Sequence, residues 1–253
     1  MPSYSIGASC TVALVGIAAC AVSWGSANAQ HMGKGLLVAG RAADINTGGR
    51  LYDNHWSVLQ REPPSKLNPL YPSKVRAPRT STWRCVTCHG WDYVGDKGHL
   101  GSGIGSEAFR SLDQVVSRAP NQIVRKLRQG SHQAIVAPLA TAQLLNLALF
   151  LSHGQYDISR VMTEKGVAKG NALYGKDIYE SACMNCHGRN GREPIVGETG
   201  DRSSLGWIAR NRPQQAVHKI RNGVPNADML SLRFLDLSSL SDLLAYLQSL
   251  DRN

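Results

Sequence analysis

The sequence predicts a helical chain that folds as two similar domains. Its 253 residues suit two small domains better than one, since a domain takes roughly 100 to 200 residues. Leucines recur at helical spacing in the segment Leu237–Leu250, which predicts a closing helix. The segment Leu139–Leu151 corresponds to it in an internal repeat, so a second closing helix is predicted there.

The composition is that of a globular protein with a hydrophobic core. Hydrophobic residues make up 42% of the chain and charged residues 18%, and no long stretch has the composition of a disordered tail. The formal net charge of +10 predicts attraction to acidic proteins, anionic lipid or nucleic acid, but carries no information on the fold. Six cysteines are too few for a disulfide scaffold.

The first thirty residues have the pattern of an export signal. The apolar run Thr11–Trp24 is followed by Ala27-Asn28-Ala29, the small-x-small pattern that is cleaved before Gln30. The run is shorter than the about 20 apolar residues that span a bilayer. A lipoprotein cleavage box ending at Cys20 is the alternative, and it would anchor the chain to a membrane through lipid. We predict a signal peptide at residues 1–29 and an exported, periplasmic protein.

Removing that segment leaves four cysteines in two short motifs. These are Cys85-Val86-Thr87-Cys88-His89 and Cys183-Met184-Asn185-Cys186-His187, and both are C-x-x-C-H, the attachment signature of c-type haem. At this spacing two thiols on one helical turn reach the porphyrin vinyl groups, and the adjacent histidine becomes the proximal iron ligand. A zinc ribbon would place its cysteine pairs about 15 to 20 residues apart, and a redox pair needs no following histidine. The sequence therefore predicts two covalently bound haem c groups, haem 1 and haem 2.

The surroundings of these motifs resemble the cytochrome c family, specifically dihaem cytochromes built from two class I-like domains. The resemblance covers most of the chain after residue 29 and is stronger in the second half. There Gly175, Ile178 and Tyr179 precede Cys183 at the spacing of the family's first helix, and a helix is expected at Gln214–Arg221. The resemblance implies an all-α fold, with helices wrapped round each haem.

The first half repeats this plan. Gly48, Leu51 and Tyr52 match the glycine, isoleucine and tyrosine of the second half, and Lys126–Gly130 matches Lys219–Gly223. The first half differs by an insertion of about residues 57–85, whose many prolines predict an irregular loop.

These comparisons set the predicted domain boundaries. Domain 1 covers residues 30–151, a linker covers residues 152–170, and domain 2 covers residues 171–253. The linker contains glycines and few apolar residues, so we expect it to be a domain connection.

The distal iron ligands are predicted from position. Met229 lies in a loop ahead of the last helix, where the family places its distal methionine, so it is predicted to ligate haem 2. The corresponding loop of the first half has no methionine, but His132 follows His89 at nearly the spacing at which Met229 follows His187. We predict His132 as the distal ligand of haem 1.

Several alternatives stay open for haem 1. Its distal position could instead be taken by His99 or His55, or be vacant. His31, His153 and His218 have the appearance of surface histidines. The aromatic residues that bracket the first motif are expected to pack against haem 1; they are Trp83, Trp91 and Tyr93.

Positive charge is concentrated in the first half. Residues 30–151 carry about twice as many basic as acidic side chains, whereas residues 171–253 are nearly balanced. One interpretation is a solvated loop that keeps the protein soluble; the other is a docking surface that steers an acidic redox partner to haem 1 and weakens with salt. Nucleic acid is not an expected partner of an exported protein. Much of the charge lies in or beside the insertion, at Arg61, Lys66, Lys74, Arg76, Arg79 and Arg84.

The ligand sets predict an electron carrier rather than an enzyme, because an iron with both axial positions filled by protein has no place for a substrate. We expect a periplasmic electron-transfer protein, either free or as the cytochrome subunit of a dehydrogenase or oxidase. Methionine ligation raises a reduction potential, so haem 1 is predicted to have the lower potential and haem 2 the higher.

An enzyme that acts on a small inorganic substrate at haem 1 is the alternative. Thiosulfate dehydrogenases are similar in plan, but that family ligates its active haem with a cysteine, and this chain after residue 29 has none outside its two motifs. Dihaem peroxidases are longer, with their motifs farther apart. Direct oxidation of a metal ion at an exposed haem edge would need no open coordination site, and the sequence neither supports nor excludes it.

Overall fold

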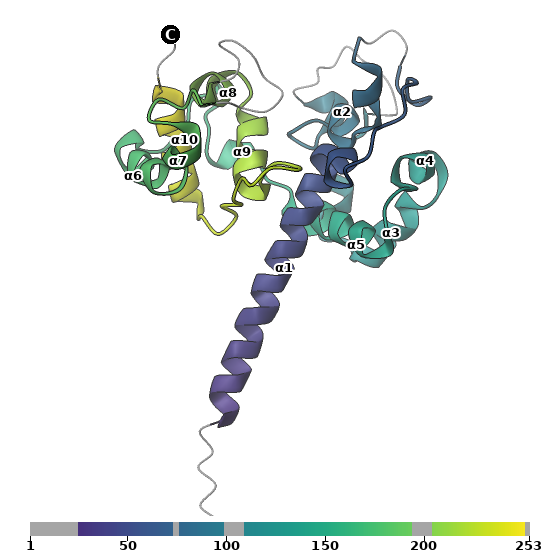
Figure 1. Cartoon of the computed structure of the whole chain (residues 1–253), viewed down its shortest axis with the longest axis horizontal. Coiled ribbons are helices and arrows are strands. Elements are labelled where there is room, and N and C mark those ends of the chain that lie inside the picture. Colours follow the sequence, from purple (N-terminus) through teal and green to yellow (C-terminus); the bar gives the residue numbers. More distant parts are fainter. Residues whose placement is uncertain (1–24, 73–75, 99–108, 194–203, 251–253) are drawn as a thin grey trace, which may run out of the picture. The chain divides into compact units, whose positions relative to one another are not determined.

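The structure is a computed structural model that describes residues 25–72, 76–98, 109–193 and 204–250. The chain divides into residues 1–39 and residues 40–253, and both C-x-x-C-H motifs lie in the second unit. Over the described ranges the regular structure is helical, with one isolated bridge between Met162 and Ala168 and no β-strand. The predicted all-α class is confirmed (Figure 1).

The first helix, α1, spans Gly25–Val58. It runs through the predicted cleavage site, and most of the predicted signal peptide lies outside the described residues. Its backbone leaves the helical conformation at Asn54 (φ −157°, ψ 88°). The Asn54 side chain accepts a hydrogen bond from the backbone N–H of Ser57 at 3.2 Å, which starts the last turn as an N-cap does.

The rest of the first half consists of short helices round one core. Leu144, Leu147 and Ala148 form the buried face of α5, and they pack with Leu51 and Tyr52 of α1. The helices are α2 (Cys85–His89), α3 (Pro120–Leu127), α4 (Gln133–Val136) and α5 (Thr141–Leu149), followed by a π-helical turn at Phe150–Gly154.

The second half has its own core and a similar set of helices. Asn171 caps α6 by accepting from the Leu173 N–H, and Asp236 caps α10 by accepting from the Ser239 N–H. In Figure 1 these helices gather round one another, and the helices predicted at Gln214–Arg221 and Leu237–Leu250 are present. The set is α6 (Ala172–Ala182), α7 (Met184–His187), α8 (Leu205–Asn211), α9 (Pro213–Asn222) and α10 (Leu237–Ser249).

Corresponding residues of the two halves make corresponding contacts. A Cβ at Gly48 would lie 2.0 Å from the Asn146 carbonyl oxygen of α5, and a Cβ at Gly175 would lie 1.9 Å from the Asp242 carbonyl oxygen of α10. In each half, therefore, a glycine allows the helix ahead of the motif to touch the closing helix. The aromatic pairs correspond as well, with ring centroids 5.4 Å apart for Tyr52–Phe150 and 5.2 Å apart for Tyr179–Tyr246.

The predicted insertion is irregular, with one 3₁₀ turn at Arg79–Trp83. It is nevertheless tied down, because Trp83 Nε1 donates to the Lys66 carbonyl at 2.7 Å and the Asn68 N–H donates to Thr82 Oγ1 at 3.0 Å. The buried indole and hydroxyl thus fold the loop back on itself.

The predicted linker is more than a connection. Val161 and Met162 are buried in the core of the second half, and Ser241 of α10 donates its hydroxyl proton to the Val161 carbonyl at 3.1 Å. The few apolar side chains of this segment are thus the ones that pack.

Among the described residues no single helix is long and apolar enough to cross a membrane. Two segments reach that composition only when taken together, Gly130–Val136 and Thr141–Gly154, and the chain bends by 118° between them.

Candidate haem centres

The first motif forms one isolated helical turn, α2, with a fixed beginning and end. Arg84 ahead of it is extended, and Gly90 after it has φ 75° and ψ 168°, a conformation that favours glycine. The buried Tyr52 hydroxyl donates to the Gly90 carbonyl at 2.6 Å. Helix α1 thereby holds the end of the motif in place.

The motif thiols are free and half-buried. No disulfide joins Cys85 or Cys88 to another described cysteine. Burial raises the pKa of Cys85 to about 12 and the pKa of Cys88 to about 11. Both cysteines start from the same helical turn, as attachment to one porphyrin requires.

His89 has the protonation state of a metal-binding imidazole. Its Nδ1 lies 2.8 Å from the Arg110 carbonyl oxygen. A carbonyl only accepts, so Nδ1 carries the hydrogen and Nε2 carries the lone pair. Burial lowers the pKa of His89 to about 4, which keeps the ring neutral at pH 7. A hydrogen bond of this kind, from the ring nitrogen that does not bind the metal, commonly orients a ligating histidine.

His132 faces His89. The two ring centroids are 6.1 Å apart and the ring planes differ by 18°. An iron bound between two imidazole nitrogens at about 2 Å each would separate the ring centroids by about 6 Å. Burial also lowers the pKa of His132, which favours the neutral ligand form. The separation of the two ring centroids therefore matches the one expected for two axial histidine ligands.

The other histidines considered for haem 1 are placed differently. His55 is 1% exposed and stacks on Trp56 with ring centroids 4.8 Å apart. Its Nε2 is buried and has no hydrogen-bond partner in the described part of the chain, and burial lowers its pKa to about 4. His99 lies outside the described residues. The structure brings His132 against His89 and pairs His55 with an aromatic ring instead.

The second motif repeats the geometry of the first. Gly188, with φ 70° and ψ 170°, ends α7, and Tyr179 of α6 donates its hydroxyl proton to the Gly188 carbonyl at 2.5 Å. Burial raises the pKa of Cys183 to about 11, whereas Cys186 is exposed. Burial lowers the pKa of His187, and its Nδ1 is a buried atom without a partner among the described residues.

Met229 lies between α9 and α10, half-buried against the second core. Its carbonyl oxygen accepts a hydrogen bond from Arg50 Nη2 at 3.4 Å. The approach of Met229 to the His187 side of the site stays a prediction.

The described ranges contain no group of three His, Cys, Asp or Glu side chains that could hold a metal ion directly. A porphyrin instead supplies four of the six iron ligands itself, so it needs only two axial protein ligands. A haem therefore needs no such group of three side chains.

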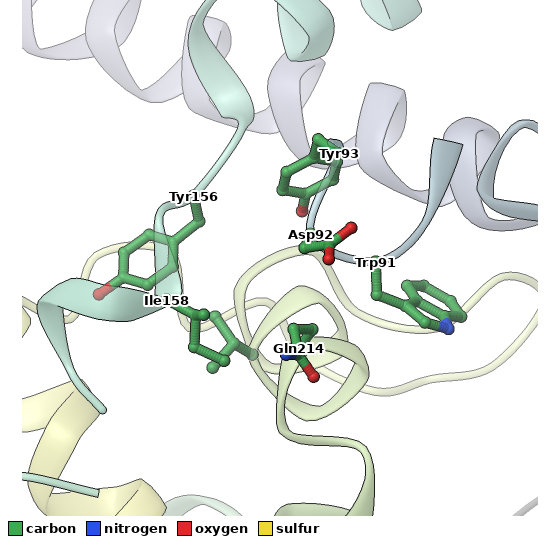
Figure 2. Close-up of a pocket in the computed structure, with 7 residues that line it drawn as sticks. Trp91, Asp92, Tyr93, Tyr156, Ile158 and Gln214 are labelled. Atoms are coloured by element: carbon green, nitrogen blue, oxygen red, sulfur yellow. The ribbon is translucent and has the colours of Figure 1, made fainter. Parts of the chain in front are cut away.

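Two aromatic residues that follow the first motif lie against α9 of the second half. Figure 2 shows Trp91, Asp92 and Tyr93 opposite Gln214. Tyr156 and Ile158 of the predicted linker lie beside them. They therefore have a role beyond the predicted packing against haem 1.

His218 of α9 joins these aromatics, with its ring centroid 5.0 Å from that of Trp91. Its Nε2 lies 3.0 Å from the Gly49 carbonyl oxygen, so Nε2 carries the hydrogen. Its Nδ1 accepts from the Tyr93 hydroxyl at 2.8 Å. The prediction that His218 is a surface histidine is wrong, since it is 1% exposed. The residues that cover His218 lie far from it in the sequence, so the local pattern could not predict its burial.

A buried carboxylate lies beside this junction. Asp53 is 2% exposed and pairs with Arg84 at 2.5 Å and with Lys219 of α9 at 3.2 Å. Sequence reasoning missed Asp53 and assigned Arg84 to the basic docking group. Arg84 is instead a partner of Asp53, directly ahead of Cys85.

The other basic residues of the insertion are exposed where the structure describes them. Arg61, Lys66, Arg76 and Arg79 all present exposed side chains, and Lys74 lies outside the described residues.

One comparison with known proteins finds a family. Residues 170–247 match the family model described as cytochrome c oxidase, cbb3-type, subunit III. No curated protein matches the chain. The matched residues contain the second motif, helices α6 to α9 and most of α10. This segment is thus similar to a c-type cytochrome domain, a kind of domain that binds haem c covalently.

Proposed function

We propose that this c-type cytochrome binds two haem c groups and transfers electrons between redox partners in the periplasm. When bound, each haem iron would carry one electron by alternating between its ferric and ferrous states. Haem 1 would be attached at Cys85 and Cys88 with axial ligands His89 and His132, and haem 2 at Cys183 and Cys186 with axial ligands His187 and Met229.

One observation supports the proposal most strongly: the near-parallel pair His89 and His132, at 6.1 Å, beside a C-x-x-C-H turn. It lies in the half of the chain that the family match does not cover. The corresponding hydrogen bonds of Tyr52 to Gly90 and of Tyr179 to Gly188 also support a haem in each half.

These residues favour a carrier over an enzyme. A histidine on each side of haem 1 would leave no iron position for a substrate. The protein's part is then to hold the axial groups, to orient the His89 ring through the Arg110 carbonyl, and to exclude water. Because methionine ligation raises a potential, haem 2 would receive electrons from haem 1.

A second candidate function is that of the cytochrome subunit of an oxidase complex. The name of the matched family favours it for residues 170–247. Purification from native membranes in mild detergent separates the two readings, since a complex subunit co-purifies with oxidase activity and a free carrier does not.

The test of the ligand sets is low-temperature EPR of the oxidised protein, for the wild type and for His132→Ala. We expect two low-spin ferric signals in the wild type and one high-spin signal in the variant. The control is His153→Ala, because His153 is exposed. A redox titration of the same signals should place the bis-histidine haem below the other.

Other outcomes would redirect the proposal. A haem content of one per chain would reject the proposal of two haem groups. A high-spin haem in the wild type would show an open iron position and favour the enzyme that acts on a small inorganic substrate. Two equal, overlapping potentials would contradict the assigned direction of electron flow.

A further inference from the structure

The segment that carries Met229 is a loop rather than a helix. It joins the end of α9 at Asn222 to the start of α10 at Leu237. A thioether is a neutral and weak electron donor. A methionine that is to bind iron through its sulfur therefore needs a backbone that is already held in place. The contacts that hold this loop therefore bear on haem 2.

The first support comes from Arg50 of α1, in the other half of the chain. Its Nε donates to the Asn222 carbonyl at 2.9 Å and its Nη2 donates to the Met229 carbonyl at 3.4 Å. One planar guanidinium thus joins the start of the loop to the ligand residue. Arginine suits this role because its donors are fixed in a fork.

Gly223 makes room for this contact. It has φ +80°, and a Cβ there would lie 2.6 Å from Arg50 Nη2 and 2.7 Å from the Met229 carbonyl oxygen. The backbone turn at Gly223 and the Arg50 side chain therefore fit one another.

The second support also reaches the first half. Arg233, in the same loop, donates from Nε to Asn46 Oδ1 at 2.7 Å. It also donates to the Gly154 carbonyl at 3.4 Å and to the Asn222 side chain. Both sides of the Met229 segment are thus tied to α1 or to the π-helical turn that follows α5.

We propose that Arg50 is a positioning residue for Met229, so that the iron–methionine bond of haem 2 depends on helix α1 of the first half. This rests on the proposed function, in which Met229 is the distal ligand. It differs from a plan of two self-contained domains, because the same helix holds the first motif through Tyr52 and Gly90. A change in α1 would reach both centres.

The experiment uses the full haem-loaded chain and the variant Arg50→Gln, with Arg41→Gln as the control. Arg41 is an exposed arginine of the same helix. The first readout is the long-wavelength absorption band that a ferric haem shows only while methionine sulfur is bound. The second is titration with imidazole, which displaces that sulfur.

We expect Arg50→Gln to weaken the band and to bind imidazole at haem 2 at least about tenfold more tightly, since hydrogen bonds from a charged group are lost. The control should match the wild type, and the haem 1 EPR signal should be unchanged in both variants. Asn46→Ala, which removes a partner of Arg233, should shift imidazole affinity in the same direction and keeps the test valid if Arg50→Gln does not fold.

Two failures are distinguishable. If the wild type lacks the band and Met229→Ala leaves its spectrum unchanged, Met229 is not the ligand, and the haem 2 assignment falls together with this inference. If Met229→Ala abolishes the band but Arg50→Gln and Asn46→Ala behave like the wild type, the assignment stands and the positioning role of Arg50 is overturned.

Discussion

His218 shows how much one side chain can join two parts of a chain. It belongs to α9, yet its two ring nitrogens bond to Tyr93 and Gly49 of the first half. Burial lowers its pKa to about 4, so the ring is neutral at pH 7. In the unfolded chain the same ring would take up a proton below about pH 6.5.

This difference predicts that stability falls on acidification. A lowered folded-state pKa means that the unfolded state binds more protons between about pH 6.5 and pH 4, so the free energy of unfolding decreases as pH falls through that window. His218 alone would account for about 3 kcal/mol between pH 7 and pH 4. Denaturant unfolding at a series of pH values measures it.

The matched variants are His218→Gln and His153→Gln. His218→Gln should make the dependence of stability on pH less steep than in the wild type, with the remaining slope supplied by the buried His55. His153→Gln changes an exposed ring and is the control. An unchanged slope in His218→Gln would show that this histidine does not control acid stability.

At the scale of helices, each motif depends on one crossing between two helices, and each crossing needs a glycine. Gly48 of α1 touches the backbone of α5, and Gly175 of α6 touches the backbone of α10. The closing helices carry the core leucines, and the crossing helices carry the tyrosines that bond to Gly90 and Gly188. A shift at either crossing would therefore move the motif.

We predict that Gly48→Ala and Gly175→Ala each lower the free energy of unfolding by about 3 kcal/mol, the upper end for overpacking, because the new methyl group meets a backbone carbonyl. Leu145→Ala, on the exposed side of α5, should change it by less than about 1 kcal/mol. Denaturant unfolding checks both. A loss below about 1 kcal/mol for the glycine variants would mean that the crossings are loose.

At the scale of the whole molecule, charge differs between the two halves. Four cations of the insertion are exposed, whereas the cations nearest the junction are bound to carboxylates or carbonyls, as Arg84 and Lys219 are to Asp53. We predict that this exposed group attracts an acidic redox partner to the proposed haem 1.

A small anionic oxidant, ferricyanide, tests this surface without a known partner. Its reaction with the reduced protein should slow as ionic strength rises from about 0.01 M to 0.15 M, where the Debye length falls from about 30 Å to 8 Å. Lys66→Glu with Arg79→Glu should slow the low-salt reaction, and a cationic cobalt complex should show the opposite trend. Equal salt dependence for wild type and variant would reject the docking surface.

The sequence by itself determined the features that depend on residues a few positions apart. The two C-x-x-C-H turns, the glycine and tyrosine ahead of each, and the leucines of α10 are all local patterns, because a helical turn and a helical face are set by residues a few positions apart. The all-α class and the helices α9 and α10 could be predicted for this reason.

The tertiary structure decided what depends on distant residues. It buried His218 under Tyr93, paired Arg84 with Asp53, packed Val161 and Met162 of the former linker into a core, and brought Arg50 to the Met229 carbonyl. Each of these contacts joins segments far apart in the chain. Burial, which sets the charge state of a histidine and the partner of an arginine, follows from those contacts and leaves no periodic trace in the sequence.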